Sequence, residues 1–408
     1  MCDFKRVIKQ IFGTYYASQL AKIFYKIPNA LLAFFPMRDE ILLESNPDLT
    51  CNTYELYRYF LQKGLNRKFR LVWRVDFPEK YENDVPPNVY YIEKNPKGIN
   101  KIRNYVRCYL ARVSISCNTN LPRYKTSRRQ LNIYLDHGSQ LKSMKGKDGK
   151  KAPLSCDYLI SQSSFFVKYH LDEYTIKTEQ IVCTGLPRDD QFFRKYNSLS
   201  KLVTNVDSYH KVIIWAPTFR AHKNGYRIDC HSKSAYGLPI LRNSLDILQL
   251  KSVLEKENIL LIIKPHPAQD MTKLKVESNN NVKVISNEEL CDCCIQINEL
   301  LAQTDALITD YSSIYYDYLF TEKPIALAID DLTEYQNEKG FVFENPLSIL
   351  KGDIVRTTDD LCKFIISVSE ENDNTLEERK NIQKMINDYD DGNASERVYN
   401  FIMSKVDC

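Results

Sequence analysis

The sequence predicts an α/β protein of two doubly wound, Rossmann-like domains that face a central cleft, preceded by an amphipathic helical segment. Short runs rich in β-branched residues alternate with helical stretches along all 408 residues, which is the pattern of parallel sheets built from βαβ units. Twelve such runs exceed what one sheet comfortably holds. The chain is 43% hydrophobic and 26% charged, as expected of a globular protein with a sizeable core.

The strand-like runs fall into two groups. Seven lie in the first half of the chain, at residues 40–45, 69–75, 88–93, 111–117, 131–136, 157–161 and 180–184. Five follow at residues 211–216, 259–264, 281–286, 306–309 and 325–330. The polar stretch 194–210 separates the groups, so we expect the domain break there. The predicted first domain is 37–205 and the second is 206–385.

Residues 1–36 are both basic and apolar. Five Lys or Arg residues stand against a single acid, Asp3, and apolar residues recur between them at spacings of three and four, which is typical of an amphipathic helix. The basic residues keep recurring instead of giving way to an apolar core and a cleavage site, which argues against a cleavable signal. Two interpretations stay open, a helix that packs on its own domain and a helix that lies on an anionic membrane surface.

The charge of the chain is distributed unevenly. The net charge is +4, yet residues 94–151 alone contain fifteen Lys or Arg and two Asp. Such a region is usually a solvated face, but it also suits an anionic partner such as lipid head groups, a polyphosphate acceptor or nucleic acid. Because no nucleic-acid-binding module can be recognised, we expect no nucleic-acid partner.

Cysteines and carboxylates give no metal-binding pattern. The twelve cysteines, without a signal peptide, indicate reduced thiols. The pair Cys291 and Cys294 has a CxxC spacing but lacks a second pair or a nearby His, so we interpret it as coincidence. The Asp-Asp pairs at 189–190, 330–331, 359–360 and 390–391 are more simply turns and caps. We therefore expect no obligatory metal and no cofactor.

The stretch 306–330 is the most informative part of the chain. An apolar run ends in Asp310-Tyr311-Ser312-Ser313, a helical segment follows, and a second apolar run opens at Pro324. Hydroxyls between a strand and a helix can cap the helix, and backbone N–H groups at that helix end can hold a phosphate. Since the chain has no glycine-rich phosphate loop, the sequence predicts phosphate binding by such helix ends, with capping alone as the simpler interpretation.

Six short motifs occur in a recognisable order along the chain. They are Asp136-His137-Gly138-Ser139, Gly185 to Asp190, Trp215 to Arg220, Lys264-Pro265-His266-Pro267, Asp310 to Ser313 and Asp391 to Arg397. From about residue 40 to the C-terminus the set resembles the CDP-glycerol glycerophosphotransferase family, the teichoic-acid primases and polymerases. The resemblance implies a GT-B-like fold whose last helix, here 386–408, packs back towards the first domain. One departure is that the family usually has an aromatic residue where this chain has Asp136, and a Thr where it has Ser139.

The reaction that the resemblance implies is transfer of glycerol phosphate from CDP-glycerol to a hydroxyl, with release of CMP and formation of a phosphodiester. The acceptor would be a lipid-linked saccharide or a polyol phosphate, in teichoic-acid or capsule-like polymer synthesis at the cytoplasmic face of the bacterial membrane. Three alternatives stay open: a CDP-ribitol or other CDP-alditol donor, a GT-B glycosyltransferase that uses a nucleotide sugar, and a binding protein without catalysis. Oligomeric state stays open as well.

Each motif residue has an expected role. His137, at the end of a strand in the acceptor-side domain, suits a general base, and His266 suits donor pyrophosphate binding and leaving-group stabilisation. The expected donor-binding residues are Arg220, Thr218, Lys264, Asp310, Ser312 and Ser313. The expected cleft or acceptor residues are Gly138, Ser139, Arg188, Asp391 and Arg397. For Arg220, Arg397 and Asp310 the simpler alternatives are a surface residue, an interdomain ion pair and a structural turn residue.

Overall fold

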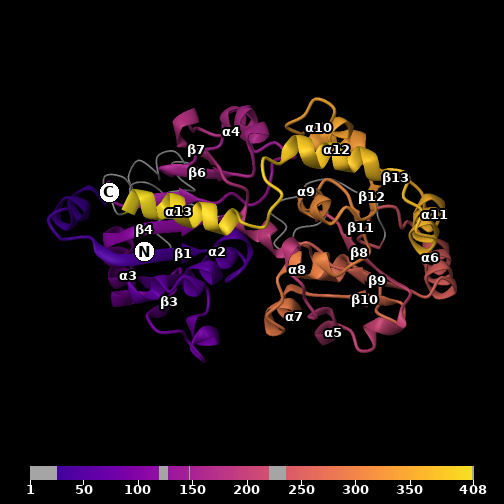
Figure 1. Cartoon of the computed structure of the whole chain (residues 1–408), viewed down its shortest axis with the longest axis horizontal. Helices are drawn as coiled ribbons and strands as arrows, with labels where there is room; N and C mark the ends of the chain where they lie inside the picture. Colours follow the sequence, from indigo (N-terminus) through magenta and orange to yellow (C-terminus); the bar gives the residue numbers. More distant parts are fainter. Residues whose placement is uncertain (1–24, 119–126, 147, 220–235, 407–408) are drawn as a thin grey trace, which may run out of the picture.

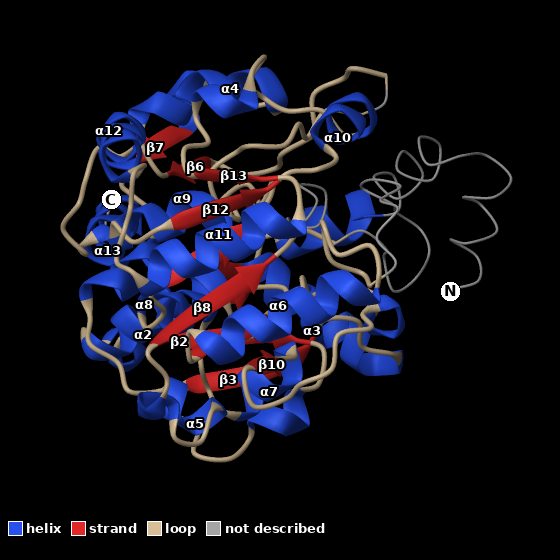
Figure 2. Ribbon diagram, turned by 90° about the vertical axis from the view of Figure 1, so that its right-hand side faces the viewer, coloured by secondary structure: helices blue, strands red, loops and turns tan. Residues whose placement is uncertain are grey.

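The computed structural model describes residues 25–118, 127–146, 148–219 and 236–406. Two α/β lobes lie side by side, the first half of the chain in one and most of the second half in the other (Figure 1). Figure 2 shows the strands inside the molecule and the helices around them. The predicted fold class is thereby confirmed for the described residues, and the N-terminal segment falls largely outside them.

The first sheet has seven strands in the order β3-β2-β1-β4-β5-β6-β7, with every pair parallel. The strands are β1 (Arg38–Glu44), β2 (Arg70–Val75), β3 (Val89–Glu93), β4 (Ala111–Ser116), β5 (Leu131–Tyr134), β6 (Tyr158–Ser161) and β7 (Ile181–Cys183). Its helices are α2 (Cys51–Gln62), α3 (Gly98–Leu110) and α4 (Val167–Glu173). All seven expected runs form these strands.

The second sheet has the order β10-β9-β8-β11-β12-β13, again with every pair parallel. The strands are β8 (Lys211–Ala216), β9 (Ile259–Ile263), β10 (Val282–Val284), β11 (Ala306–Thr309), β12 (Ile325–Ala328) and β13 (Asp353–Val355). The helices are α5 (Leu199–Leu202), α6 (Ser244–Lys256), α7 (Asn287–Asp292), α8 (Ile297–Ala302), α9 (Ile314–Tyr318), α10 (Leu332–Glu338), α11 (Thr358–Ser369) and α12 (Leu376–Ile386). β13, an edge strand of three residues, was not predicted from the sequence.

Continuous burial explains why these runs form parallel strands. All five residues of β9 are buried, as are all four of β11 and β12, because helices cover both faces of the sheet. One large hydrophobic cluster joins the second sheet to the first domain through Leu141 and Phe166. There Phe166 packs edge-on against Tyr316 of α9, with ring centroids 5.5 Å apart. The two domains therefore share apolar contacts as well as polar ones.

The last helix, α13 (Ala394–Val406), lies against the first domain (Figure 1). Val398 and Ile402 are fully buried in the same cluster as β1, β2 and α2. Asp190 accepts hydrogen bonds from the Ala394 and Ser395 backbone N–H groups, both at 2.8 Å, and so caps the start of this helix. One of the Asp-Asp pairs thus supplies a cap, as its position in the sequence suggested.

Of the predicted N-terminal segment, residues 1–24 lie outside the described part of the chain, and residues 25–32 are helical. This helix contacts α3: Tyr109 Oη donates to the Asn29 carbonyl at 3.1 Å, and the rings of Tyr25 and Tyr105 are 5.0 Å apart. Its apolar residues Ile27 and Leu31 nevertheless stay exposed. Within the described residues, no helix has the length and apolar content needed to cross a bilayer.

Candidate active site

The carboxyl ends of the parallel strands bring the predicted motifs together. In the first sheet, β1, β4 and β5 are neighbours, so the segments that begin at Ser45, Cys117 and Asp136 leave the same edge. In the second sheet, β9, β8 and β11 are neighbours, and the segments that carry His266, Thr218 and Ser312 leave one edge as well. Ligand sites of doubly wound sheets lie at such edges.

The segment Asp136–Ser139 is held tightly around an exposed His137. Asp136 is buried, has a φ of +52°, and accepts a hydrogen bond from the His137 backbone N–H at 2.7 Å. The His137 ring is 3.6 Å from the Cys51 sulfur through Nδ1. Ser139 is buried beside it. The imidazole is therefore presented by a fixed backbone at the edge of the first sheet.

Gly138 lies close to Ser313 of the second domain. Its φ is +116°, and a Cβ built on it would lie 2.4 Å from Arg188 Nη2 and 3.0 Å from Ser313 Oγ. Neither the backbone conformation nor the space admits a side chain. The structure thus places the motif of His137 next to the serine pair that follows β11.

Arg188 joins the two domains at this point. It is buried and donates from Nη1 to the His137 carbonyl at 3.1 Å, and from Nη2 to Asp317 of α9 at 2.8 Å. Asp189 is buried alongside, and burial together with the nearby Asp317 raises the pKa of its carboxyl group well above the ordinary value. Arg188, expected in the cleft, is accordingly a buried bridge between the His137 segment and α9.

Asp136 lies in a buried polar group that an aromatic residue could not form. Its Oδ2 is 3.8 Å from Nδ1 of His170, and His170 Nε2 is 3.0 Å from Ser161 Oγ. Burial raises the pKa of Asp136 to about 6 and lowers the pKa of His170 to about 4. Both shifts disfavour the charged forms of the two side chains in this interior. Asp136, which departs from the family pattern, is therefore paired with His170.

In the second domain, Asp310 and Thr218 bind each other. The buried Asp310 carboxylate accepts from the Thr218 N–H at 2.9 Å and from Thr218 Oγ1 at 2.8 Å. Both residues were expected to bind the donor directly. Their mutual hydrogen bonds fix the backbone after β8 against the backbone after β11, and their role in donor binding stays a prediction.

Lys264 likewise has a buried position. Its Nζ donates to the Pro265 carbonyl at 2.9 Å and to Asn287 Oδ1 at 2.7 Å, and burial lowers its pKa to about 8. His266 is half-buried, accepts from the Ala268 N–H at 3.0 Å through Nδ1, and lies 5.1 Å from the Phe219 ring. Lys264 therefore supports the turn that presents His266, and the donor-binding roles of both residues stay predictions.

The serine pair differs in detail from the expected cap. Ser313 is the N-cap residue of α9, but its side chain forms no capping hydrogen bond, and Ser312 Oγ is 3.5 Å from the Ile314 N–H. Both residues are half-buried. Ser313 Oγ thus takes no part in capping, Ser312 Oγ accepts one long hydrogen bond from the first turn of α9, and phosphate binding by the pair stays a prediction. Arg220, the expected phosphate clamp, lies outside the described residues.

Asp391 and Arg397 form a clamp at the start of α13. Arg397 Nη1 contacts both Asp391 oxygens, at 3.0 and 2.7 Å. Its Nε donates to the Thr184 carbonyl at 2.7 Å, and its guanidinium stacks 3.8 Å from the Tyr389 ring centroid. The bond to Arg397 lowers the pKa of Asp391. Arg397 ties the returning chain to the end of β7 through Thr184, while its ion pair with Asp391 lies within one segment, so it is not the interdomain ion pair of the simpler expectation.

Three residues of this site were not predicted from the sequence, namely Cys51, Asn52 and Asp317. Asn52 is fully buried; its Nδ2 donates to the Leu135 and Asp136 carbonyls at 3.1 and 3.2 Å, and its Oδ1 accepts from the Arg188 N–H at 3.1 Å. All three lie in helices rather than after a strand, and no motif marks them. Only the folded contacts reveal them.

Two further observations limit the site. Among the described residues, no three His, Cys, Asp or Glu side chains are grouped to bind one metal ion, and the need for a metal stays untested. A cavity of about 650 Å³ lies near Lys195 and Tyr209, at the amino ends of β8 and β11. That is the edge opposite to the motifs, so the cavity does not belong to the site built here.

Two parallel, doubly wound sheets whose carboxyl edges meet at the His137 and Ser313 segments define a GT-B-like α/β protein. A model of the family described as CDP-glycerol:poly(glycerophosphate) glycerophosphotransferase matches residues 29–404, and the chain belongs to that family. The resemblance seen in the six motifs is therefore confirmed.

Named relatives agree with this family. The teichoic acid glycerol-phosphate primase of Bacillus subtilis (strain 168) is 31% identical over 258 residues, 63% of this chain and 60% of the relative. The teichoic acid ribitol-phosphate primase of Bacillus spizizenii is 27% identical over 257 residues, 61% of this chain and 59% of that relative. The matched region thus spans about three-fifths of both relatives. The solved structure of the wall teichoic acid polymerase TagF superposes with a TM-score of 0.69 at 22% identity, over 99% of this chain and 97% of that one, and shows the same fold.

Proposed function

We propose that the protein transfers glycerol phosphate from CDP-glycerol to a hydroxyl of a lipid-linked or polymer acceptor and releases CMP. The observation that carries the proposal is the approach of the His137–Gly138 backbone to Ser313, which brings a base from one domain to the phosphate-binding turn of the other. Family membership and the similarity to teichoic acid primases support the reaction class. A CDP-ribitol donor is the second candidate, because relatives named for ribitol phosphate match over a similar length.

The roles follow from the positions of the side chains. His137 takes the proton of the acceptor hydroxyl as its oxygen attacks the phosphorus that bears glycerol, and the bond from that phosphorus to CMP breaks. His266 and the hydroxyls of Ser312 and Ser313 bind the donor phosphates. Arg188 holds the His137 carbonyl and Asp317 together, so that base and donor keep their relative positions.

The first test measures the products. The purified protein, CDP-glycerol and a lipid-linked saccharide acceptor should give CMP and an acceptor heavier by glycerol phosphate, followed by mass spectrometry. A parallel reaction with CDP-ribitol shows which alditol phosphate the protein transfers. Release of a nucleoside diphosphate from a nucleotide sugar would instead indicate a glycosyltransferase. If none of the donors is consumed, the proposed activity is wrong.

The second test separates the two histidines. His137→Ala should lower kcat by roughly 10²- to 10⁴-fold, the usual contribution of general acid–base catalysis, with donor affinity nearly unchanged. His266→Ala should weaken CDP-glycerol binding as well as transfer. His210, exposed at the start of β8, provides the matched control, and His210→Ala should leave both quantities unchanged. A His137→Ala variant with normal turnover and lost donor binding would make His137 a donor ligand.

We also propose that the protein binds the cytoplasmic face of the membrane through the helix at residues 25–32 and the first turn of α3. Exposed apolar residues gather there, namely Ile27, Leu31, Phe34, Phe35, Ile99 and Ile102. Exposed Lys26, Lys101 and Arg103 lie among them. Apolar residues edged by basic ones suit an anionic lipid surface, where each basic residue contributes about 1 kcal/mol.

Vesicle binding tests this surface. Phe34→Ser with Phe35→Ser should weaken binding to anionic phosphatidylglycerol vesicles by roughly ten- to a hundredfold, since two aromatic side chains would no longer be buried in lipid. Leu245→Ser with Leu248→Ser, on the exposed face of α6, is the control and should have no effect. Equal vesicle binding by both double variants would show that the anchor lies elsewhere.

A further inference from the structure

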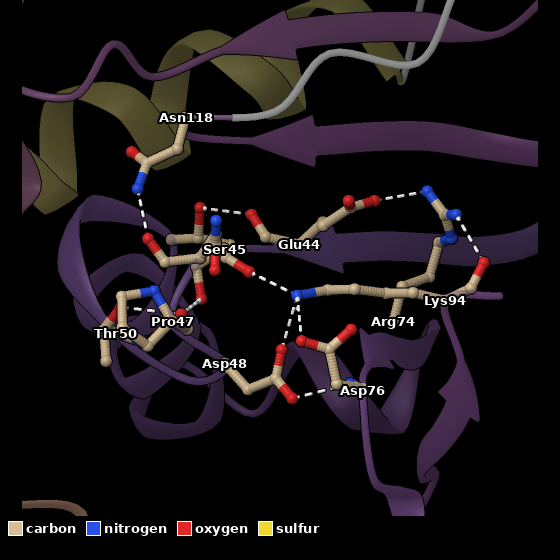
Figure 3. Close-up of polar contacts among 11 residues, drawn as sticks. Glu44, Ser45, Pro47, Asp48, Thr50, Arg74, Asp76, Lys94 and Asn118 are labelled. Atoms are coloured by element: carbon tan, nitrogen blue, oxygen red, sulfur yellow. Dashed lines mark hydrogen bonds and ion pairs between the residues drawn. The ribbon is translucent and has the colours of Figure 1, made fainter. Parts of the chain in front are cut away.

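The segment between β1 and α2 lies outside the predicted motifs, yet several hydrogen bonds hold it in place. Figure 3 shows Lys94 Nζ donating to the Ser45 carbonyl at 2.8 Å and to Asp48 Oδ1 at 2.5 Å, while Asp48 Oδ2 accepts from the Asp76 N–H at 2.6 Å. Asn118, which follows β4, donates to the Asn46 carbonyl (Figure 3). The ends of two neighbouring strands are thereby tied together, and α2 starts at a fixed position.

That position belongs to Cys51, the first residue of α2, which has a φ of +63°. Three groups converge on its partly exposed sulfur. Arg188 Nη1 donates at 3.4 Å, His137 Nδ1 lies 3.6 Å away, and the buried Cys117 thiol is a further hydrogen-bond donor. The amino end of the twelve-residue helix α2 adds positive potential. This is a set of donors that suits an anionic sulfur.

The electrostatic consequence agrees with this geometry. The hydrogen bond from Cys117, followed by the charge of Arg188 and the hydrogen bond from His137, lowers the pKa of Cys51 well below that of an ordinary thiol, although burial opposes the shift. Cys117 shows the reverse, since burial and then the bond to Cys51 raise its pKa. The two opposite shifts favour ionisation of Cys51 before Cys117.

The remaining charged groups near the sulfur are the carboxyl groups of Asp317, Asp136 and Asp189. Asp317 binds Arg188 from α9, and Asp136 accepts from the His137 backbone at the end of β5. Asp189, on the same turn as Arg188, has a raised pKa because of its burial and the neighbouring Asp317. Arg188 is therefore shared between Asp317 and the Cys51 sulfur, and it links both to the His137 carbonyl.

We propose that Cys51 is a thiolate positioning residue, which accepts the Nδ1–H of His137 and so makes Nε2 the basic nitrogen of the ring. The inference rests on the proposed function, in which His137 is the base. When Nε2 takes the proton of the acceptor hydroxyl, the ring becomes positive, and the sulfur stabilises it as the third member of a catalytic triad stabilises its histidine. Cys51 acts through His137 and touches neither donor nor acceptor.

The pairing can be measured without any substrate. The difference in ultraviolet thiolate absorbance between wild type and Cys51→Ser, followed against pH, should show a thiolate well below the pH at which ordinary thiols ionise. In His137→Ala this titration should move to higher pH, because one donor is lost. A titration of Cys51 in the ordinary range, or one that His137→Ala leaves unchanged, would overturn the inference.

Kinetics test the positioning role itself. Cys51→Ala should lower kcat by roughly ten- to a hundredfold, less than loss of the base, with an unchanged KM for the donor. Cys51→Asp should recover part of the loss, because a carboxylate also accepts the Nδ1–H, whereas a structural cysteine would not be replaced by a charge. Cys183→Ala, at the end of β7, is the control and should keep wild-type kcat.

The two arms distinguish the possible failures. If wild type transfers glycerol phosphate and Cys51→Ala keeps its kcat, the positioning role is wrong and the proposed function stands. If no CDP-alditol is consumed by wild type, the proposed function is wrong, and the absorbance titration still decides whether Cys51 and His137 interact. Melting temperatures of all variants identify any loss of fold, in which case Cys51→Ser replaces Cys51→Ala in the kinetic arm.

Discussion

At the scale of single residues, Gly138 sets how closely the two domains can meet. Its positive φ and the 2.4 Å between a built Cβ and Arg188 Nη2 leave no room for a methyl group. The neighbouring guanidinium binds Asp317 and the His137 carbonyl, so a displaced Arg188 would lose contacts to both. The absence of a side chain at Gly138 therefore lets the His137 segment and the Ser313 turn lie close together.

Gly138→Ala should accordingly reduce transfer by about tenfold or more and destabilise the fold by roughly 1–3 kcal/mol, from backbone strain and the displaced ion pair. Denaturant unfolding and steady-state kinetics measure the two effects. Gly149, also at positive φ but with no atom near a built Cβ, is the control for strain alone. If Gly138→Ala and Gly149→Ala lose equal stability and both keep their activity, close approach at Gly138 has no role.

At the scale of elements, the buried polar group of Asp136, His170 and Ser161 lies at the carboxyl ends of β5 and β6. The titration of Asp136 and His170 predicts how the free energy of unfolding depends on pH. His170 has a folded pKa of about 4, below its unfolded value, so its contribution to stability is present above about pH 6.5 and is lost as the pH falls towards 4. Asp136 has a folded pKa of about 6, above its unfolded value, so its contribution is largest at low pH and is lost as the pH rises from about 4 to 6. The two slopes oppose each other between pH 4 and 6.

Asp136→Asn removes the contribution of Asp136 to the pH dependence of the free energy of unfolding, and it keeps an acceptor for the His137 N–H. The free energy of unfolding of this variant should fall on acidification from pH 6 to 4 more steeply than that of wild type, by at most about 1.4 kcal/mol per pH unit. Urea titrations at several pH values measure the difference. Parallel profiles for the variant and wild type would show that Asp136 is not protonated in this range in the folded protein.

The sequence predicts an element well when the residues that determine it lie within one segment, and poorly when contacts between distant segments determine it. The run ILLII of β9 is apolar throughout because both faces of a parallel strand are buried, and such runs were recognised. β13 has only three residues, and nothing local distinguishes it. Thr218 and Asp310 were recognised as motif residues, but their mutual hydrogen bonds depend on the alignment of β8 with β11, which no single segment contains. Cys51 and Asn52 escaped for the same reason.

At the scale of the whole molecule, Arg397 fastens α13 to the first domain. Arg397→Ala should lower the free energy of unfolding by about 1–2 kcal/mol, since a partly exposed ion pair, a hydrogen bond to Thr184 and a stacked ring are lost together. It should also speed proteolysis at residues 387–393, measured by limited digestion. Lys384→Ala, exposed on α12, is the control. A fall in kcat/KM without lost stability would instead give Arg397 a role in the cleft.

The chain passes between the domains twice, once after β7 and once before α13, and the two passages touch. A Cβ built on Gly392 would lie 2.7 Å from the Cβ of Phe193, and Asp190 binds the Ala394 and Ser395 N–H groups close by, so the two segments are in contact. The two domains are also held together away from this crossing, by the ion pair of Arg188 with Asp317 and by the packing of Phe166 against Tyr316. A swing of one domain about the crossing therefore breaks these contacts, so their strength limits how far the two domains separate.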